Sequence, residues 1–277
     1  MNIDRLLLNF LDEDIGKGDI TSNILPDKIV DANIICKEDA IIAGIEECIR
    51  LFNLVGCSAN ALVNDGTYVK KGTSVIDING NAKKILSAER TALNIMMRMS
   101  GIATLTRRYI DTVRSINNKV MISGTRKTAP GLRHFDKKAI EVAGGYPHRY
   151  RLDEMILIKD NHLAILGSVK EAVRLARKYY DNKYKIEVEV ESLEDARDAI
   201  NAGADIIMLD NLNAGEVNNI ISILKDEGLR DKVLIEVSGG INLDNIKEYA
   251  RSDVDIISIG SITHSVKAID LSLEINL

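Results

Sequence analysis

Cationic side chains concentrate between residues 123 and 162 of a chain whose net charge is −5. Five of them follow apolar or glycine-rich segments, and a sixth candidate lies upstream: Arg126, Lys127, His148, Arg149 and Lys159, with Arg90. An arginine fork binds a carboxylate or phosphate through two parallel hydrogen bonds, whereas lysine acts as a point charge. Lys159 follows four consecutive apolar residues, which argues against a merely solvated cluster. The set therefore predicts a pocket for a small molecule with several anionic groups.

Two acidic residues end apolar segments further along the chain. Glu189 lies in the segment 186–190, and Asp210 follows the segment 206–209. Such a pair can hold Mg²⁺ beside a polyphosphate or stabilise a developing cation. Glu187 points to the same side of its strand as Glu189. The pattern alone therefore does not decide between the two glutamates.

Two glycine turns each follow a late apolar segment, a position where α/β barrels commonly hold a phosphate on backbone N–H groups. The turns are Ser238-Gly239-Gly240 and Gly260-Ser261. Tight backbone packing is the alternative reason for glycine here. We interpret His162 and His264 as structural or supporting residues rather than catalytic ones.

The elements that must position these residues change character near Gly101. Before it, the pattern indicates helices at 3–12 and 46–55, strands within 32–45 and 61–80, and a long helix from 82 to about 116 that breaks near Ser100-Gly101. After it, six apolar strand-length segments alternate with helical stretches: 120–123, 155–158, 186–190, 206–209, 233–237 and 256–260. This alternation predicts an α/β fold with parallel strands, a β/α barrel rather than a dinucleotide-binding sheet, with its chemistry at the carboxyl ends of the strands.

Composition excludes several function classes. The chain is 45% hydrophobic and 28% charged, which is typical of a globular protein with a sizeable core. The pI near 5.5 argues against non-specific nucleic-acid binding. No apolar run reaches the roughly 18–20 residues of a membrane span, and the first residues lack a secretory signal pattern. The three cysteines form no CxxC pair, so we predict buried, inert thiols and a cytoplasmic protein.

The motifs in this order resemble the quinolinate phosphoribosyltransferase family. They are EDIGKGDIT (13–21), SAERTALNIMMRMSGIAT (87–104), TRKTAPGLR (125–133), GGYPHRYRLD (144–153), LIKDNH (157–162), EVEVES (187–192), MLDN (208–211), EVSGGI (236–241) and SIGSITHS (258–265). The resemblance covers nearly the whole chain. It implies an incomplete, seven-stranded TIM-like α/β barrel, residues 104–265, preceded by a smaller N-terminal α/β sandwich domain, residues 1–103, which the tail 266–277 could join.

The resemblance also implies an assembly, a homodimer or dimer-based hexamer in which one subunit closes the barrel mouth of another. By that likeness Arg90 would reach the active site of the partner subunit. The implied pocket for quinolinate comprises Arg90 from the partner, Arg126, Lys127, His148, Arg149 and Lys159. Lys127, Lys159, Glu189 and Asp210 would be catalytic.

Phosphoribosyl pyrophosphate would bind Glu189, Asp210, Ser238, Gly239, Gly240, Gly260, Ser261 and His264, with Mg²⁺ held directly or indirectly by Glu189 and Asp210. The family likeness thus favours Glu189 over Glu187. The implied reaction joins the two substrates to give nicotinate mononucleotide, pyrophosphate and CO₂ in de novo NAD biosynthesis. The alternatives are a paralogue associated with molybdenum transport, a nicotinate phosphoribosyltransferase, and a non-catalytic nucleotide-binding protein of the same fold. The retained Lys159, Glu189 and Asp210 favour the quinolinate enzyme.

Overall fold

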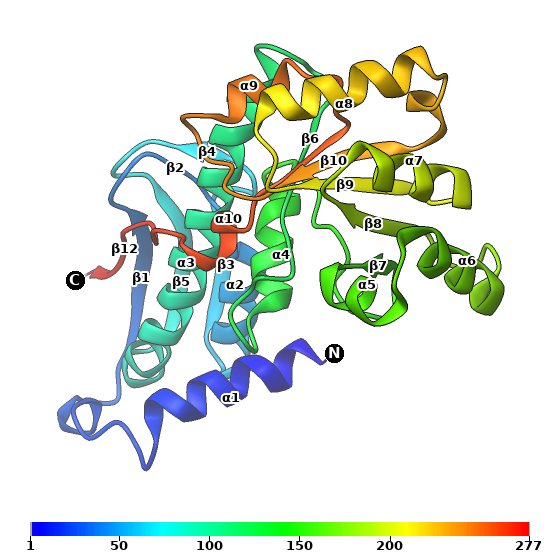
Figure 1. Ribbon diagram of the computed structural model, residues 1–277. Helices are drawn as coiled ribbons and strands as arrows, with labels where there is room; N and C mark the ends of the chain where they lie inside the picture. Colours follow the sequence, from blue (N-terminus) through cyan, green and yellow to red (C-terminus); the bar gives the residue numbers. More distant parts are fainter. Residues whose placement is uncertain (1, 277) are drawn as a thin grey trace. The chain divides into compact units, whose positions relative to one another are not determined.

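A computed structural model describes residues 2–276, which divide into two compact units (Figure 1). The first unit contains residues 1–107, 134–143 and 265–277, and the second contains residues 108–133 and 144–264. Each unit is built from segments that are distant in the sequence. The domain boundaries near residues 103 and 265 stay predictions.

The first unit is built on an antiparallel sheet with the strand order β12-β1-β5-β3. These strands are β1 (Ile29–Cys36), β3 (Ser58–Ala61), β5 (Ser74–Asn81) and β12 (Leu271–Asn276). Alternate residues of β1 are buried, as expected for a strand with one face on a core. In Figure 1, β12 lies beside β1 although the two come from opposite ends of the sequence.

Helices and a short hairpin complete the first unit. They are α1 (Ile3–Ile15), the 3₁₀ turn η1 (Ser22–Ile24), α2 (Ile45–Leu54), and the paired strands β2 (Ala40–Ile41) and β4 (Tyr68–Val69). The helix α2 packs against β3 and β5, and α1 packs against α2. The predicted helices at 3–12 and 46–55 are therefore present.

The long helix α3 (Ala82–Arg114) is continuous, so the predicted break near Ser100-Gly101 is wrong. Glycine costs a helix roughly 1 kcal/mol relative to alanine but does not end it when packing compensates. A Cβ at Gly101 would lie 2.3 Å from the carbonyl oxygen of Lys267. Gly101 is thus required by the close approach of another backbone, and it does not mark a helix end.

Residues 134–142 of α4 (Arg133–Val142) belong to the first unit, and a buried ion pair joins this helix to α3. The guanidinium of Arg98 donates to both carboxylate oxygens of Asp136, at 2.7 and 2.8 Å. Asp136 is fully buried, so this bidentate pairing compensates its charge.

The second unit is built on a parallel sheet with the order β6-β11-β10-β9-β8-β7. The strands are β6 (Met121–Ser123), β7 (Ile156–Ile158), β8 (Ile186–Val190), β9 (Ile206–Asp210), β10 (Leu234–Ser238) and β11 (Ile256–Ser258). The helical elements are α5 (Asp160–Leu166), α6 (Val169–Tyr180), α7 (Leu193–Ala202), α8 (Ala214–Asp226), η2 (Arg230–Lys232), α9 (Ile246–Ala250) and α10 (Ser261–His264). Each of the six predicted strands is present among the described residues, and the α/β fold with a parallel sheet is confirmed.

Alternation along these strands sorts their side chains to two faces. On β8, Val188 and Val190 are buried on one face, and Glu187 and Glu189 point to the other. The register places Glu189 beside Met208 of β9, and Met208 beside Glu236 of β10. Glu189, Met208 and Glu236 are therefore aligned on one face of the sheet.

Two further observations bear on the composition. None of the helices in the described chain is long and apolar enough to cross a membrane. Cys36, Cys48 and Cys57 are free and buried, as predicted, and burial raises the pKa of each thiol.

Candidate active site

A pocket of about 370 Å³ opens at the carboxyl ends of the strands of the second unit. Its lining combines strand ends with the loops that follow them: Gly124, Thr125, Arg126, Lys127, His148, Arg149, Leu157, Lys159, Glu189, Met208, Asp210, Glu236, Ser238 and Ser258. All five predicted cations of the second unit lie here, together with both predicted carboxylates. Cationic and acidic side chains therefore line the same pocket.

Two guanidinium groups lie close together in the pocket. Burial, and then the charge of Arg126, lower the pKa of Arg149. The guanidinium of Arg149 donates to the backbone carbonyl of Met155 at 3.0 Å, which fixes its direction. The Nε of Arg126 is buried and has no hydrogen-bond partner among the described residues. A buried donor without a partner is costly, so Arg126 is ready to bind an anionic ligand.

Lys159 and Glu189 form an ion pair across β7 and β8. Lys159 is the residue that precedes α5, and its backbone N–H donates to Nδ1 of His162 at 3.0 Å. His162 thus caps the helix that begins after Lys159, which agrees with its interpretation as a structural residue. The ammonium of Lys159 is held at the pocket, where it compensates the partly buried carboxylate of Glu189.

Lys127 lies over the turn that follows β11. A Cβ at Gly260 would lie 3.0 Å from Cδ of Lys127 and 3.3 Å from the ring of His264. The backbone carbonyl of Lys127 accepts a hydrogen bond from Thr263 at 2.9 Å. The absence of a side chain at Gly260 therefore lets the stem of Lys127 and the His264 ring approach the same backbone.

The turn after β10 packs directly on the turn after β9. Gly239 has a φ of +93°, and a Cβ there would lie 2.2 Å from Oδ1 of Asn211. Asn211 itself has a φ of +56°, and its backbone N–H donates to the carbonyl of Ser238 at 2.9 Å. Within the described residues, the backbone N–H groups of Gly239 and Gly240 donate to no other protein group. They are available to an external anion.

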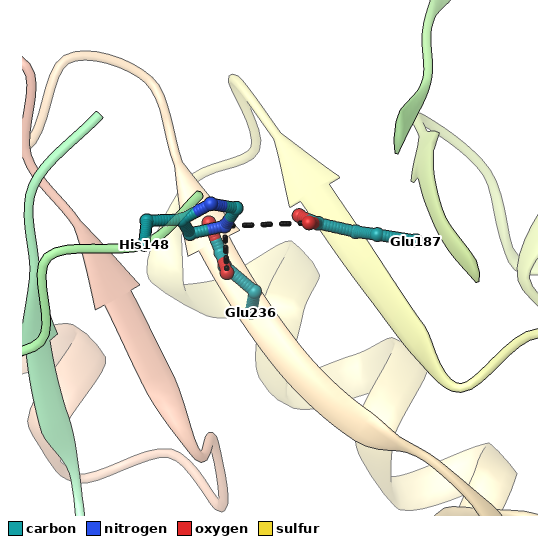
Figure 2. Close-up of side chains that lie close together, drawn as sticks. All are labelled: His148, Glu187 and Glu236. Carbon is teal, nitrogen blue, oxygen red and sulfur yellow. Dashed lines mark ion pairs between the residues drawn. The ribbon is translucent and has the colours of Figure 1, made fainter. Parts of the chain in front are cut away.

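His148 contacts two buried glutamates that the sequence analysis did not assign to the site (Figure 2). Its Nε2 lies 3.3 Å from a carboxylate oxygen of Glu187 and 3.3 Å from one of Glu236. Burial lowers the pKa of His148, but the two carboxylates outweigh burial and raise that pKa to about 9. Burial and the charge of Glu236 also raise the pKa of Glu187.

Nδ1 of His148 accepts the backbone N–H of Arg149 at 2.9 Å, so the neutral ring carries its proton on Nε2, the nitrogen that faces the two carboxylates. The charged ring would carry a second proton on Nδ1, which would then no longer accept this hydrogen bond. A signal for Glu236 was present in the sequence: it is a charged residue within an otherwise apolar strand, 233–237. Pattern alone could not show that Glu187, two residues before Glu189, meets this histidine.

The remaining predicted residues do not line the pocket. Gly239 and Gly240 lie in the turn after β10, and Gly260 lies in the turn after β11. Ser261 and His264 belong to the helix α10 that follows, next to residues that line the pocket. Arg90 is an exposed residue of α3 in the first unit. The roles assigned to individual residues stay predictions, and the structure establishes which of them share a pocket.

Fold and pocket together define an α/β protein with a parallel-sheet unit whose strand ends form a pocket lined by both cationic and acidic side chains. Comparison with known proteins narrows this class. Residues 19–100 match the model of the quinolinate phosphoribosyl transferase N-terminal domain, and residues 102–274 match that of the C-terminal domain of the same family. The chain therefore belongs to the quinolinate phosphoribosyl transferase family.

Individual relatives agree with this assignment. The probable nicotinate-nucleotide pyrophosphorylase (carboxylating) of Methanothermobacter thermautotrophicus is 45% identical over 264 residues, 95% of each chain. The protein of the same description from Bacillus subtilis is 38% identical and covers 100% of this chain and 94% of its own length. The solved structure of nicotinate-nucleotide pyrophosphorylase from Francisella tularensis superimposes with a TM-score of 0.92 at 37% identity, covering 99% of this chain and 96% of that one.

Proposed function

We propose that this protein transfers the phosphoribosyl group of phosphoribosyl pyrophosphate to quinolinate and releases CO₂, pyrophosphate and nicotinate mononucleotide. The reaction belongs to de novo NAD biosynthesis. One observation carries the proposal: a single pocket combines converging cations with the carboxylates of Glu189 and Asp210. The cations suit an acceptor with two carboxylates. The carboxylates suit a ribosyl centre that becomes positively charged.

The acceptor subsite comprises the cations around the Arg126 and Arg149 pair. Quinolinate has adjacent carboxylates on a pyridine ring, and a pair of guanidinium groups can bind each through parallel hydrogen bonds. The partnerless Nε of Arg126 supports this orientation. Lys127, His148 and Lys159 complete the subsite, and Arg90 of the partner subunit would close it.

The donor subsite comprises the turns after β10 and β11. The available N–H groups of Gly239 and Gly240 support their role as ligands of the 5′-phosphate. Ser238, Gly260, Ser261 and His264 would complete the phosphate site. Glu189 and Asp210 would face the ribose between the two subsites.

The donor residues also fit Mg²⁺. Glu189 and Asp210 present oxygen donors to one pocket, and proteins bind Mg²⁺ through one or two carboxylates plus the phosphates of the substrate. When bound, Mg²⁺ would neutralise negative charge on the departing pyrophosphate. The carboxylates themselves suit a second task, which is to stabilise positive charge at C1 of the ribose.

The reaction has two steps, which are attack of the ring nitrogen on C1 and then loss of CO₂. First, the cation cluster orients quinolinate so that its ring nitrogen attacks C1 as the bond to pyrophosphate breaks. The ring is then a pyridinium, and the electron pair of the C2–carboxylate bond stays on C2 as CO₂ leaves. A proton replaces CO₂ at C2. Enclosure of the pocket would exclude water, which would otherwise attack C1.

The assembly and the barrel are part of the proposal. We infer a homodimer or a hexamer of dimers with shared active sites, in the cytoplasm, and an incomplete seven-stranded barrel. An isolated parallel bridge between Ser123 and Tyr146 supports the seventh position, because it adds a further extended segment beside β6.

The decisive experiment follows CO₂ release from carboxyl-labelled quinolinate, with phosphoribosyl pyrophosphate and Mg²⁺. We expect release that requires both substrates, and no turnover in a matched reaction with nicotinate. Turnover of nicotinate without CO₂ release would assign the protein to the non-decarboxylating reaction. No turnover with either acceptor would favour a molybdenum-associated or non-catalytic member of the same fold.

A further inference from the structure

Two carboxylates to which the proposed reaction gives no role lie at the pocket: Glu236 lines it, and Glu187 contacts His148, which lines it as well. Glu187 enters from β8 and Glu236 from β10, and both are 0% exposed. In Figure 2 the two side chains approach the His148 ring from different directions. Apart from the ion pairs with His148, none of their four oxygens has a hydrogen-bond partner among the described residues.

Buried carboxylates without hydrogen-bond partners destabilise the fold, so the presence of Glu187 and Glu236 at these positions requires a physical reason. Burying a carboxylate costs desolvation free energy, and apolar residues would fill the same space without that cost. Glu187 and Glu236 lie on the pocket face of the sheet, on either side of β9. Both carboxylates contact the imidazole of His148, which indicates that their role concerns this ring.

The backbone of His148 needs external support. Its φ is +58°, a strained conformation that non-glycine residues seldom adopt. Such a conformation persists only when the surroundings determine it. The next residue, Arg149, donates its backbone N–H to the same ring and directs its guanidinium to the carbonyl of Met155. The position of the ring and that of Arg149 are therefore mechanically linked.

We propose that Glu187 and Glu236 are positioning residues, which hold the His148 ring from two sides and so fix His148 and Arg149 in the orientation that binds the acceptor carboxylates. The inference rests on the proposed function, since the acceptor is its pyridine dicarboxylate. Glu236 lines the pocket, whereas Glu187 is absent from its lining. Glu189, two residues after Glu187, faces the pocket itself.

A metal ion is the competing explanation for two carboxylates and an imidazole whose ligand atoms lie within 4.8 Å of one another. The ring orientation argues against it. Nδ1 of His148 accepts the N–H of Arg149, so the ring proton lies on Nε2, the atom that faces both glutamates. A protonated nitrogen has no lone pair for a metal.

The test compares kinetic constants across matched variants: Glu187→Gln, Glu187→Ala, Glu236→Gln and Glu236→Ala. Glu47→Gln is the control, because Glu47 is also a buried, ion-paired glutamate but belongs to the first unit. We expect each alanine variant to raise KM for quinolinate about tenfold or more, with KM for phosphoribosyl pyrophosphate within about twofold. The glutamine variants, which keep an acceptor oxygen for Nε2–H, should recover part of the loss.

A second readout does not depend on activity. The chain has four histidines, so nitrogen NMR of the imidazoles can resolve His148. We expect a slowly exchanging Nε2 proton in the wild type that becomes exposed to exchange in Glu187→Ala and Glu236→Ala. The glutamine variants are close in shape to the wild type, so they keep the test informative if the alanine variants fail to fold.

Three outcomes would overturn the inference. One is equal effects on KM for both substrates, and another is an unchanged His148 signal in the alanine variants. The third is a tightly held transition metal that is lost in Glu187→Gln. If the wild type releases no CO₂, the proposed function fails, but the NMR measurement still decides whether the glutamates hold the ring.

Discussion

The ammonium of Lys159 pairs with the carboxylate of Glu189 across two neighbouring strands of the parallel sheet. In the proposed function these residues serve different substrates, since Lys159 binds the acceptor and Glu189 faces the ribose. Without substrates, each compensates the charge of the other. An acceptor carboxylate would compete with Glu189 for the ammonium of Lys159. Once Lys159 is bound to the acceptor, the carboxylate of Glu189 would be free to stabilise positive charge at C1 of the ribose.

Replacing Lys159 by alanine should weaken quinolinate binding selectively. Loss of a hydrogen bond to a charged group is worth about 1.5–3 kcal/mol, and phosphoribosyl pyrophosphate should bind with nearly unchanged affinity. Calorimetric titration of each ligand measures both effects. Lys170→Ala, at an exposed lysine of α6, is the matched control and should change neither affinity. Equal weakening of both ligands would show that Lys159 does not belong to the acceptor subsite.

Mixed subunits test the role of Arg90. The Arg90→Ala and Lys159→Ala chains should each lose most of their activity at low quinolinate concentration, but a mixture that exchanges subunits should regain activity, because some heterodimers contain one site with both residues intact. Recovery is measured after dissociation and reassociation of differently tagged chains. If mass spectrometry confirms exchange and no activity returns, Arg90 does not act across a subunit boundary.

The two glycines after β10 should respond differently to alanine. Gly239→Ala places a Cβ 2.2 Å from Oδ1 of Asn211 and adds strain at a φ of +93°, so it should displace the turn and raise KM for phosphoribosyl pyrophosphate. Gly240→Ala meets open space at a φ of +61°, so strain alone, about 1 kcal/mol, should lower stability with a smaller kinetic effect. Steady-state kinetics and urea unfolding separate the two effects. Equal KM values in both variants would contradict a phosphate site shaped by Gly239.

Stability should fall at alkaline pH because of His148. Its pKa in the folded protein is about 9, above the unfolded value of 6.5, so its contribution is complete below pH 6.5 and is lost as pH rises through 9. The carboxylates that face it are Glu187 and Glu236. We expect the unfolding free energy to decrease by about 1–3 kcal/mol between pH 6.5 and 9.5 in the wild type, and by clearly less in His148→Gln. Parallel curves for the two proteins would show that the pair with the glutamates does not stabilise the charged ring.

Strand positions in the second unit were predictable because apolar runs of four or five residues followed by polar or glycine residues are a strong local signal. The pocket followed from the same pattern, since parallel strands bring their carboxyl ends to one edge. Glu236 escaped notice because a strand pattern does not show which charged side chain is buried. The contact of Glu187 with His148 joins residues of different strands and loops, and spacing along one chain carries no information about it.

The error at Gly101 has a different origin. A glycine within a helical pattern is an ambiguous signal, since it either ends the helix or admits a close neighbour. Here the neighbour is the backbone of Lys267, which is 166 residues later in the sequence. Local helix propensity carries no information about this contact, because the contact depends on where residue 267 packs in the fold.

The pairing of β12 with β1 has a consequence for the order in which the protein forms during synthesis. Residues 29–36 leave the ribosome early, but the strand that covers their edge, residues 271–276, is translated after the whole second unit. Until then one edge of β1 presents unpaired backbone groups, a surface that favours association with other chains. The second unit can fold before the last strand of the first unit has been synthesised. We therefore expect the nascent chain to need protection from aggregation at β1, near its N-terminal end, rather than in the segments that are translated last.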